Sequence, residues 1–455
     1  MGKRAVVLAG GGSRGAYQIG VWRALRELGI DYQIVTGTSV GALNGAMMVQ
    51  GDYEVAAALW ETLLTSDVVN ADLPDEAPDY SDPRWESEVW GVFLKKAIQG
   101  GGLDFSPLEG IMEKYISEER IRQSPVDFGV VTVEYPSMKA LELAREEIPA
   151  GKIADYVMAS AACFPAFKVK EIDRVKYIDG GYQDYMPVGL ALRLGADEVI
   201  AVDLKAVGIR RKPKDSSVPV KLVRSRWNLG PFLLFEPTLS GRNMALGYLD
   251  AKKALGALDG DWFAFEKGSW QTQQAKLANK LDRLLALAEA DGRDAPSRVG
   301  KLRLLRALGL GKGAVREALL LPAAELAGRL LKLPPERPYS CEAFDSRLLA
   351  AFADAKAEAA QQAARLADGS ASLSELADVL RREGKQVLLS AVYALLSRAL
   401  AGEKSAADFW RLAVAAPPEL AAACYLWLLE QEGTESTGRF LEGKPSLAKL
   451  SCKDF

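Results

Sequence analysis

The first fifty residues constrain the fold most, because glycine-rich turns twice separate an apolar segment from a helical pattern. Residues 4–9 read as a buried strand, and the turn Gly-Gly-Gly-Ser-Arg-Gly at 10–15 leads into a helical pattern. A second strand is expected over 32–36, then the turn Gly-Thr-Ser-Val-Gly at 37–41 and a second helical pattern over 42–49. This alternation is typical of an α/β domain with a largely parallel sheet.

The same pattern resumes after a less regular region. Strands are expected near 128–133, 140–143 and 198–203, together with a hairpin formed by 167–172 and 175–178. Further predicted elements are helices over 52–64, 107–121, 153–162 and 243–255 and a last strand at 262–265. The region between residues 51 and 124, with Trp85, Trp90 and Phe93, suggests a lid or an acyl-chain wall, or simply core packing.

The chain of 455 residues is too long for one hydrophobic core, so at least two domains are expected. Beyond about residue 268 the composition shifts to alanine, leucine, arginine and glutamate with helical spacing, interrupted by glycine and proline. We therefore expect an α/β domain over 1–267 and an all-α domain over 268–455. The second carries no catalytic signature, so membrane docking, lid control, partner binding, dimerisation and simple stabilisation all stay open for it.

Charge and cysteine usage exclude several classes of protein. A net charge of −3 argues against nucleic acid as a partner, since neutralising phosphates needs a basic surface. Four widely spaced cysteines favour neither a zinc site nor a disulfide framework, and a reducing compartment is the simpler expectation. The sequence offers no signal peptide and no run of about 18 apolar residues, so a cytoplasmic location is expected.

Ser39 lies at the tip of the second glycine turn. Between a strand and a helix, such a serine has its hydroxyl lifted clear of the sheet, and glycine two residues before and after it (Gly37 and Gly41) removes a clash. The helix that follows directs its positive dipole end at this point. The pattern suits a nucleophile, although a glycine-rich turn without chemistry has the same form.

The chain contains no histidine, so a Ser-His-Asp triad is excluded. Asp179 is the candidate partner, because it ends a predicted strand and is followed by Gly180 and Gly181. An aspartate of ordinary pKa is a poor base towards serine, but direct contact in a dry pocket can make such a pair work. The alternative is an Asp-Gly turn of the ordinary kind.

The first glycine turn has three interpretations. Gly10, Gly12 and Gly15 fit a dinucleotide fingerprint, but that fingerprint needs an acid at the end of the second strand, and Asp31 lies at its beginning. Alternatively, consecutive glycines can direct several backbone N–H groups towards an oxyanion beside Ser39. A tight turn between strand and helix without chemistry is the third.

Together the motifs at 10–15, 37–41 and 179–181 resemble the patatin-like phospholipase family, which carries a glycine-rich oxyanion loop, a G-x-S-x-G serine and a D-G-[GA] aspartate. The segments 159–165 and 185–188 are similar to it as well, and the resemblance covers about residues 4–265. It implies a three-layer α/β/α fold with a mainly parallel sheet. The lack of histidine agrees with the serine–aspartate dyad of that family.

The resemblance implies that Ser39 is the nucleophile, that Asp179 is the general base, and that the amides of Gly11 and Gly12, with Arg14 near them, form the oxyanion hole. The expected reaction transfers an acyl group from a lipid ester to water through an acyl-serine.

No cofactor is implied, although some members need calcium or a protein activator. Peripheral membrane contact is one expectation, and residues 221–236 suit either a membrane-facing loop or an ordinary strand and core segment. The rival is a silent nucleotide- or lipid-binding module on the same fold.

Overall fold

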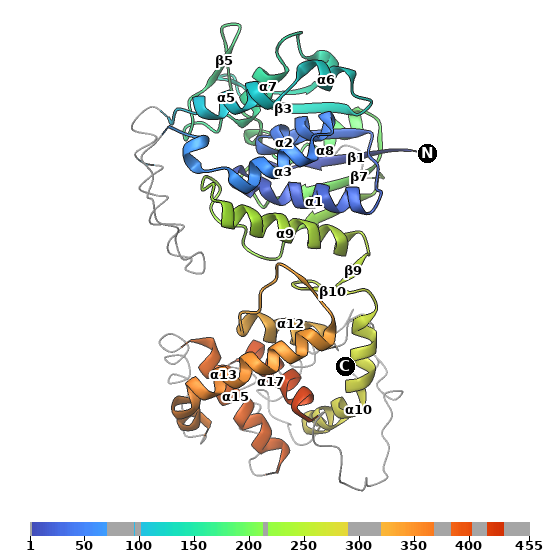
Figure 1. Ribbon diagram of the computed structural model, residues 1–455, viewed down its shortest axis with the longest axis vertical. Helices are drawn as coiled ribbons and strands as arrows, with labels where there is room; N and C mark the ends of the chain where they lie inside the picture. Colours follow the sequence, from blue (N-terminus) through green and yellow to red (C-terminus); the bar gives the residue numbers. More distant parts are fainter. Residues whose placement is uncertain are drawn as a thin grey trace. The chain divides into compact units, whose positions relative to one another are not determined.

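The computed structural model describes residues 2–70, 95, 102–212, 217–289, 320–367, 384–402 and 416–431. The chain divides into two compact units, Met1–Ala257 and Leu258–Phe455 (Figure 1). The sequence put the domain boundary after residue 267 instead. Residues 258–267 fall in the second unit because their two short strands pair with each other and with a strand at 338–339. The expected last strand at 262–265 is therefore part of the second unit.

The first unit is built on one mixed sheet of eight strands. Taken from one hydrogen-bonded neighbour to the next, the strands are β5 (Lys170–Ile172), β6 (Val175–Asp179), β3 (Asp127–Tyr135), β2 (Ile34–Thr38), β1 (Lys3–Leu8), β7 (Ala196–Asp203) and β8 (Val220–Arg224), while β4 (Lys139–Ala144) also pairs with β3. The run from β3 to β8 is parallel throughout, so the carboxyl ends of these five strands share one edge. The mainly parallel sheet is confirmed.

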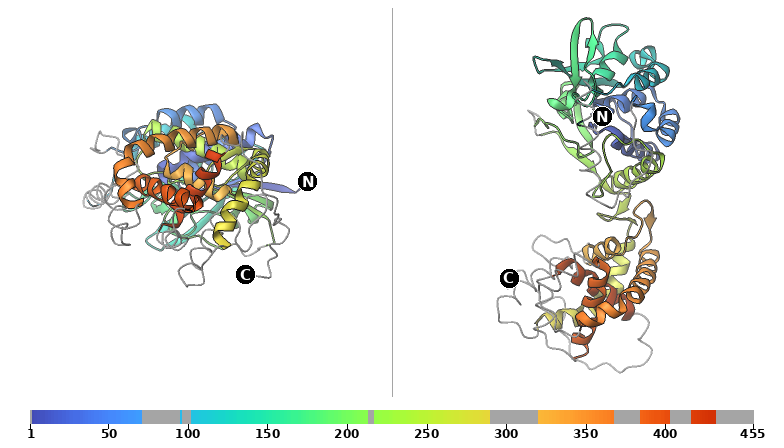
Figure 2. Two further views of the ribbon diagram at one scale, coloured as in Figure 1. Left: turned by 90° about the horizontal axis from the view of Figure 1, so that it is seen from below. Right: turned by 90° about the vertical axis from the view of Figure 1, so that its left-hand side faces the viewer.

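Helices cover both faces of this sheet (Figure 1, Figure 2). They are α1 (Ala16–Glu27), α2 (Val40–Gln50), α3 (Tyr53–Thr62), α5 (Ser106–Tyr115), α6 (Glu118–Gln123), α7 (Ile153–Ala161), α8 (Val188–Arg193) and α9 (Pro237–Ala254). Alternate residues of β1 enter two separate cores: Val6 and Leu8 pack with α1 and α2, whereas Val7 packs with α8. The expected three-layer α/β/α arrangement is confirmed.

Two strands meet end to end beside β3, and this positions the site. β2 pairs with residues 127–131 of β3, and β6 pairs antiparallel with residues 132–135. Because β4 occupies the opposite edge of β3, β2 and β6 lie along the same edge. Thr38 is opposite Val131 and Asp179 is opposite Thr132, so the ends of the two strands abut. Ser39 follows Thr38 directly.

Some predicted boundaries were wrong for local reasons. The second strand runs to Thr38, so it includes Gly37. The helix predicted over 107–121 is two helices, α5 and α6, because Ile116 is extended and the Ser117 side chain accepts the Arg120 N–H and caps the second helix. Trp85, Trp90 and Phe93 lie outside the described residues, so the lid interpretation of that stretch stays a prediction.

The second unit is mainly helical, as expected. Its described helices are α10 (Ser269–Glu289), α12 (Leu321–Leu330), α13 (Cys341–Ala367), α15 (Lys385–Leu400) and α17 (Pro417–Glu430), and its small sheet contains β9 (Leu258–Asp259), β10 (Ala264–Glu266) and β11 (Pro338–Tyr339). α17 packs against α12, α13 and α15 and is buried from Leu420 to Leu429. No described helix is both long enough and apolar enough to cross a membrane.

Candidate active site

Ser39 forms the sharp turn between β2 and α2, with φ 56° and ψ −130°. That backbone conformation is strained for a residue with a side chain. The chain is also crowded here: a Cβ on Gly37 would lie 2.1 Å from the Gly41 carbonyl oxygen, and a Cβ on Gly41 would lie 2.2 Å from the Leu8 carbonyl oxygen. Glycine is therefore required on both sides of the serine, and a turn this costly needs the surrounding structure to hold it.

Asp179 lies beside this serine, at the end of β6. The residue is 6% exposed, and its Oδ1 accepts the Gly181 N–H at 2.7 Å. Burial raises the pKa of the Asp179 carboxyl to about 6, while the nearby Ser39 side chain and the Gly181 N–H act in the opposite direction. A carboxylate of this kind is a better proton acceptor than an ordinary aspartate and is still mostly ionised at neutral pH.

The glycine loop lies against Ser39 on its other side. A Cβ on Gly10 would lie 3.2 Å from the Ser39 Cβ, and the Gly10 N–H donates to the Tyr185 carbonyl. In the described part of the chain, the N–H groups of Gly11 and Gly12 have no hydrogen-bond partner. Gly12 has φ 56°, and a Cβ there would lie 1.8 Å from the Phe232 carbonyl oxygen. Two donors are thus unused beside the serine.

Arg14 contacts the loops around the site. Its Nε donates to the Gly230 carbonyl at 2.7 Å and its Nη1 to the Lys205 carbonyl at 3.2 Å. Ser13 makes two hydrogen bonds to the loop before α9. Its N–H donates to the Phe232 carbonyl, and its hydroxyl donates to the Pro231 carbonyl. The glycine loop is therefore fastened to the segments before α9 and after β7.

Ser160 of α7 is a site residue that sequence reasoning missed. Its hydroxyl accepts the Ser39 N–H at 2.9 Å and donates to the Val131 carbonyl at 2.6 Å. It ties the strained turn to the middle of β3 and occupies the N–H of Ser39 itself. The only available signal was its place in the segment 159–165, and no local rule marks a helical serine as the partner of a distant turn.

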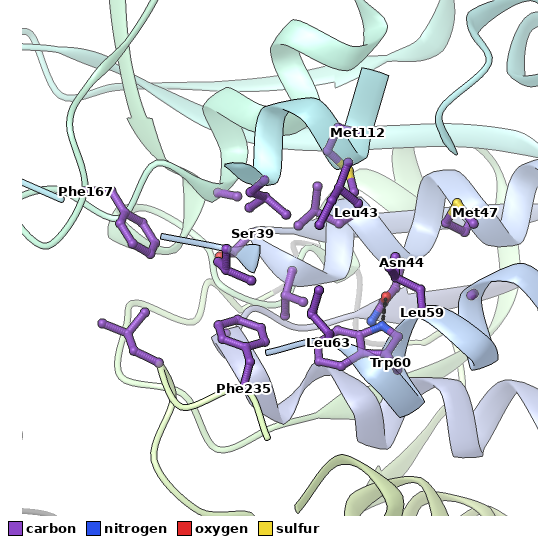
Figure 3. Close-up of a pocket in the computed structure, with 18 residues that line it drawn as sticks. Ser39, Leu43, Asn44, Met47, Leu59, Trp60, Leu63, Met112, Phe167 and Phe235 are labelled. Atoms are coloured by element: carbon purple, nitrogen blue, oxygen red, sulfur yellow. Dashed lines mark hydrogen bonds between the residues drawn. The ribbon is translucent and has the colours of Figure 1, made fainter. Parts of the chain in front are cut away.

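An apolar cavity of about 60 Å³ opens beside Ser39 (Figure 3). This is room for roughly four to six water molecules. Its wall comes from α2, α3, α5, the end of α7 and the loops near them. The side chains include Leu43, Met47, Leu59, Trp60, Leu63, Met112, Phe167, Leu233 and Phe235. The Trp60 and Phe235 rings stack, with centroids 5.9 Å apart. Such a wall suits a hydrocarbon chain attached to a group held at Ser39.

The polar side chains of Asn44 and Trp60 in the cavity wall are hydrogen-bonded within the protein. Asn44 donates to the Gly15 carbonyl and to Gln18, and its own side-chain oxygen accepts the Trp60 indole N–H at 2.9 Å (Figure 3). The Gln18 amide donates to the Ala9 carbonyl at 2.7 Å. This buried network links α1, α2, α3 and the glycine loop, so it fixes the loop against the helix that follows Ser39.

Among the described residues, no group of three or more acidic, cysteine or histidine side chains could hold a metal ion. Asp31, the acid that a bound ribose would need, precedes β2 at the amino edge of the sheet, whereas the glycine loop follows β1 at the carboxyl edge. The geometry therefore favours acyl chemistry over nucleotide binding at this loop.

Comparison with known proteins also favours acyl chemistry at this site. A family profile described as patatin-like phospholipase matches residues 6–192. The chain is 28% identical over 266 residues to "Lysophospholipase NTE1" of Coccidioides immitis, covering 55% of this chain and 15% of that protein. It is 27% identical over 212 residues to "Patatin-like phospholipase domain-containing protein 7" of Rattus norvegicus, covering 44% and 13%. The chain thus spans only a small part of the length of these relatives.

Among solved structures, VipD from Legionella pneumophila aligns at 15% identity with a TM-score of 0.35, covering 94% of this chain and 90% of that one. The type III effector protein ExoU aligns at 17% identity with a TM-score of 0.32, covering 90% and 80%.

Proposed function

Residues 6–192 belong to the patatin-like phospholipase family, and on that premise we propose that this chain is a serine hydrolase that cleaves carboxylic esters of lipids. The observation that carries the proposal is that the buried Asp179 carboxylate lies beside Ser39, where the ends of β2 and β6 abut. Asp179 accepts the hydroxyl proton while the Ser39 oxygen attacks the ester carbonyl carbon. The electron pair of the carbonyl bond moves to its oxygen, giving a tetrahedral oxyanion.

The free N–H groups of Gly11 and Gly12 stabilise this oxyanion, and the dipole of α2 adds to their effect. Protonated Asp179 then gives its proton to the leaving alcohol as the ester bond breaks, and the acyl group stays on Ser39. In the second half a water molecule gives its proton to Asp179 and attacks the acyl carbonyl. The Ser39 oxygen leaves and regains a proton, which releases the fatty acid.

Substrate class follows from the cavity and from the relatives. The apolar wall beside Ser39 suits an acyl chain. The curated relatives are named as lysophospholipases and patatin-like phospholipase domain proteins, so phospholipids and lysophospholipids are the first substrates to test. The cytoplasmic location remains a prediction, and so do the roles given to the two domains, an acyl hydrolase for the first and a helical domain of open role for the second.

Labelling with a fluorophosphonate tests the proposal at its nucleophile. We expect the wild type to gain the mass of one probe on the peptide that contains Ser39, and Ser39→Ala to gain none. The control is Ser240→Ala, since Ser240 is a buried serine of α9. Wild-type protein that stays unlabelled and hydrolyses no ester would support the silent binding module. Labelling without turnover would point to a site that waits for an activator or a membrane.

A further inference from the structure

Two loops flank the candidate site at the carboxyl edge of the sheet. The loop after β7 is bound to the aspartate motif, since the Ile209 N–H donates to the Gly181 carbonyl at 3.1 Å and the Ile209 carbonyl accepts the Tyr185 N–H at 2.8 Å. The loop before α9 is bound to the glycine loop through the Phe232 carbonyl, which accepts the Ser13 N–H at 2.8 Å. Each loop is thereby fixed to one of the two motifs that meet at Ser39.

These loops expose large apolar side chains. Val207 is fully exposed, at 103% of its reference area, Ile209 is 53% exposed and Phe232 is 38% exposed. The neighbouring residues Leu233 and Phe235 point the other way and line the cavity. Arg14 joins the two loops through the carbonyls of Lys205 and Gly230, and the exposed parts of these apolar side chains contribute little to the stability of this unit.

The same region is strongly basic. Between residues 204 and 226 the sequence has eight lysines and arginines against one acid, in a chain whose net charge is −3. Arg210 and Lys212 are exposed and, within the described residues, have no ion-pair partner. Burial and the nearby charges of Arg224 and Arg226 lower the pKa of Lys205, which places these three cations close together.

We propose that Val207, Ile209, Arg210, Lys212 and Phe232, here called the docking surface, bind the protein to an anionic lipid bilayer. The apolar tips enter the interface, and the cations pair with anionic headgroups. Charge complementarity favours an anionic bilayer as the partner. A neutral bilayer or an apolar protein groove would offer no negative charge to pair with the cations around the apolar tips. The proposal rests on the proposed function, because such docking brings ester lipids to Ser39.

The test measures binding of the full chain to vesicles of non-hydrolysable diether lipids, so that turnover does not alter the surface. Wild type should sediment with vesicles of mixed phosphatidylcholine and phosphatidylglycerol and much less with phosphatidylcholine alone. Arg210→Gln/Lys212→Gln should weaken partitioning about thirty-fold, at about five-fold for each cation. Val207→Ser/Ile209→Ser should weaken it about ten-fold.

Matched controls lie elsewhere in the same unit. Arg23→Gln/Arg26→Gln removes two exposed cations from the far end of α1, and Val55→Ser removes an exposed valine of α3. Both should bind as the wild type does. Thermal unfolding of each variant checks the fold, and fully exposed Val207 has little packing to lose.

Three results would overturn the proposal: no wild-type binding to anionic vesicles, equal binding to neutral ones, or docking variants that bind as their controls do. The first would assign the surface to a protein partner. Hydrolysis of a water-soluble ester by the wild type without vesicles tests the proposed function separately. Failure of the docking proposal can therefore be distinguished from failure of the proposed hydrolase function.

Discussion

At the scale of single residues, Asp179 combines a proposed catalytic role with a cost in stability. Its folded pKa of about 6 lies above the ordinary value of 3.8, because burial disfavours the charged form. Because the folded pKa is raised, the stability that the protonated Asp179 carboxyl contributes is fully present below pH 4 and is lost as pH rises through about 6. The folded and ordinary pKa values differ by about two units, so the free energy of unfolding above pH 6 is lower by about 3 kcal/mol.

Asp179→Asn should therefore be inactive yet more stable than the wild type at pH 8. The asparagine keeps an acceptor for the Gly181 N–H and has no charge to bury. Chemical denaturation at pH 8 and pH 4 measures the difference, which should shrink to near zero at pH 4. A variant that is less stable than the wild type at pH 8 would show that the carboxylate holds the fold together.

Ser160 should position Ser39 without taking part in the reaction. Ser160→Ala removes the acceptor of the Ser39 N–H and a donor to the Val131 carbonyl. Leaving the Ser39 N–H without a partner costs about 1–3 kcal/mol of stability. We expect kcat for a soluble ester to fall about ten- to a hundred-fold with KM little changed, because the turn loses its fixed geometry. Ser240→Ala is the buried-serine control. Equal losses of kcat in both variants would reduce Ser160 to a packing role.

At the scale of elements, the strands and the helices after the two glycine turns could be predicted from the sequence, since each has a local pattern. What could not be predicted is how β6 meets β2. Asp179 ends an antiparallel strand that lines up with β2 along β3, and that register is set by long-range pairing. The sequence suggested an acyl-chain wall within 51–124, where Trp60 and Met112 lie, but not that Phe235, from a distant segment, lines the same cavity.

The cavity wall should set the preferred acyl length. Ala56 and Met112 both line the cavity, on α3 and α5. Ala56→Leu should shift the ratio of kcat/KM for a long ester over a short one down about ten-fold, because it fills the space. Met112→Ala should shift the ratio up by a similar factor. Because the two substitutions should change the ratio in opposite directions, a general loss of folding or activity cannot explain both. Changes in the same direction would place the acyl chain elsewhere.

At the scale of the whole molecule, the chain has two units with separate cores. The sequence predicted two domains from the change in composition and a strand at 262–265, which overlaps β10. It did not predict β9 or β11, because strands of two residues leave no periodic signal. Residues 1–257 contain every residue proposed for catalysis and docking.

A truncated chain of residues 1–257 should fold cooperatively and hydrolyse a water-soluble ester with kcat/KM within about three-fold of the full chain. Each unit buries its own apolar core, so the first should not need the second for stability. Calorimetry of both proteins and a standard ester assay make the comparison. A folded but inactive fragment would assign the second unit a direct part in activity.

The most direct measurement is kcat/KM for a p-nitrophenyl ester as a function of pH, in the wild type, Ser39→Ala and Asp179→Asn. The wild type should lose activity about ten-fold per pH unit below about pH 6, as Asp179 takes up its proton. Both variants should lose at least about a thousand-fold at every pH. Full activity in either variant, or a wild-type profile flat down to pH 4, would contradict the serine–aspartate pair.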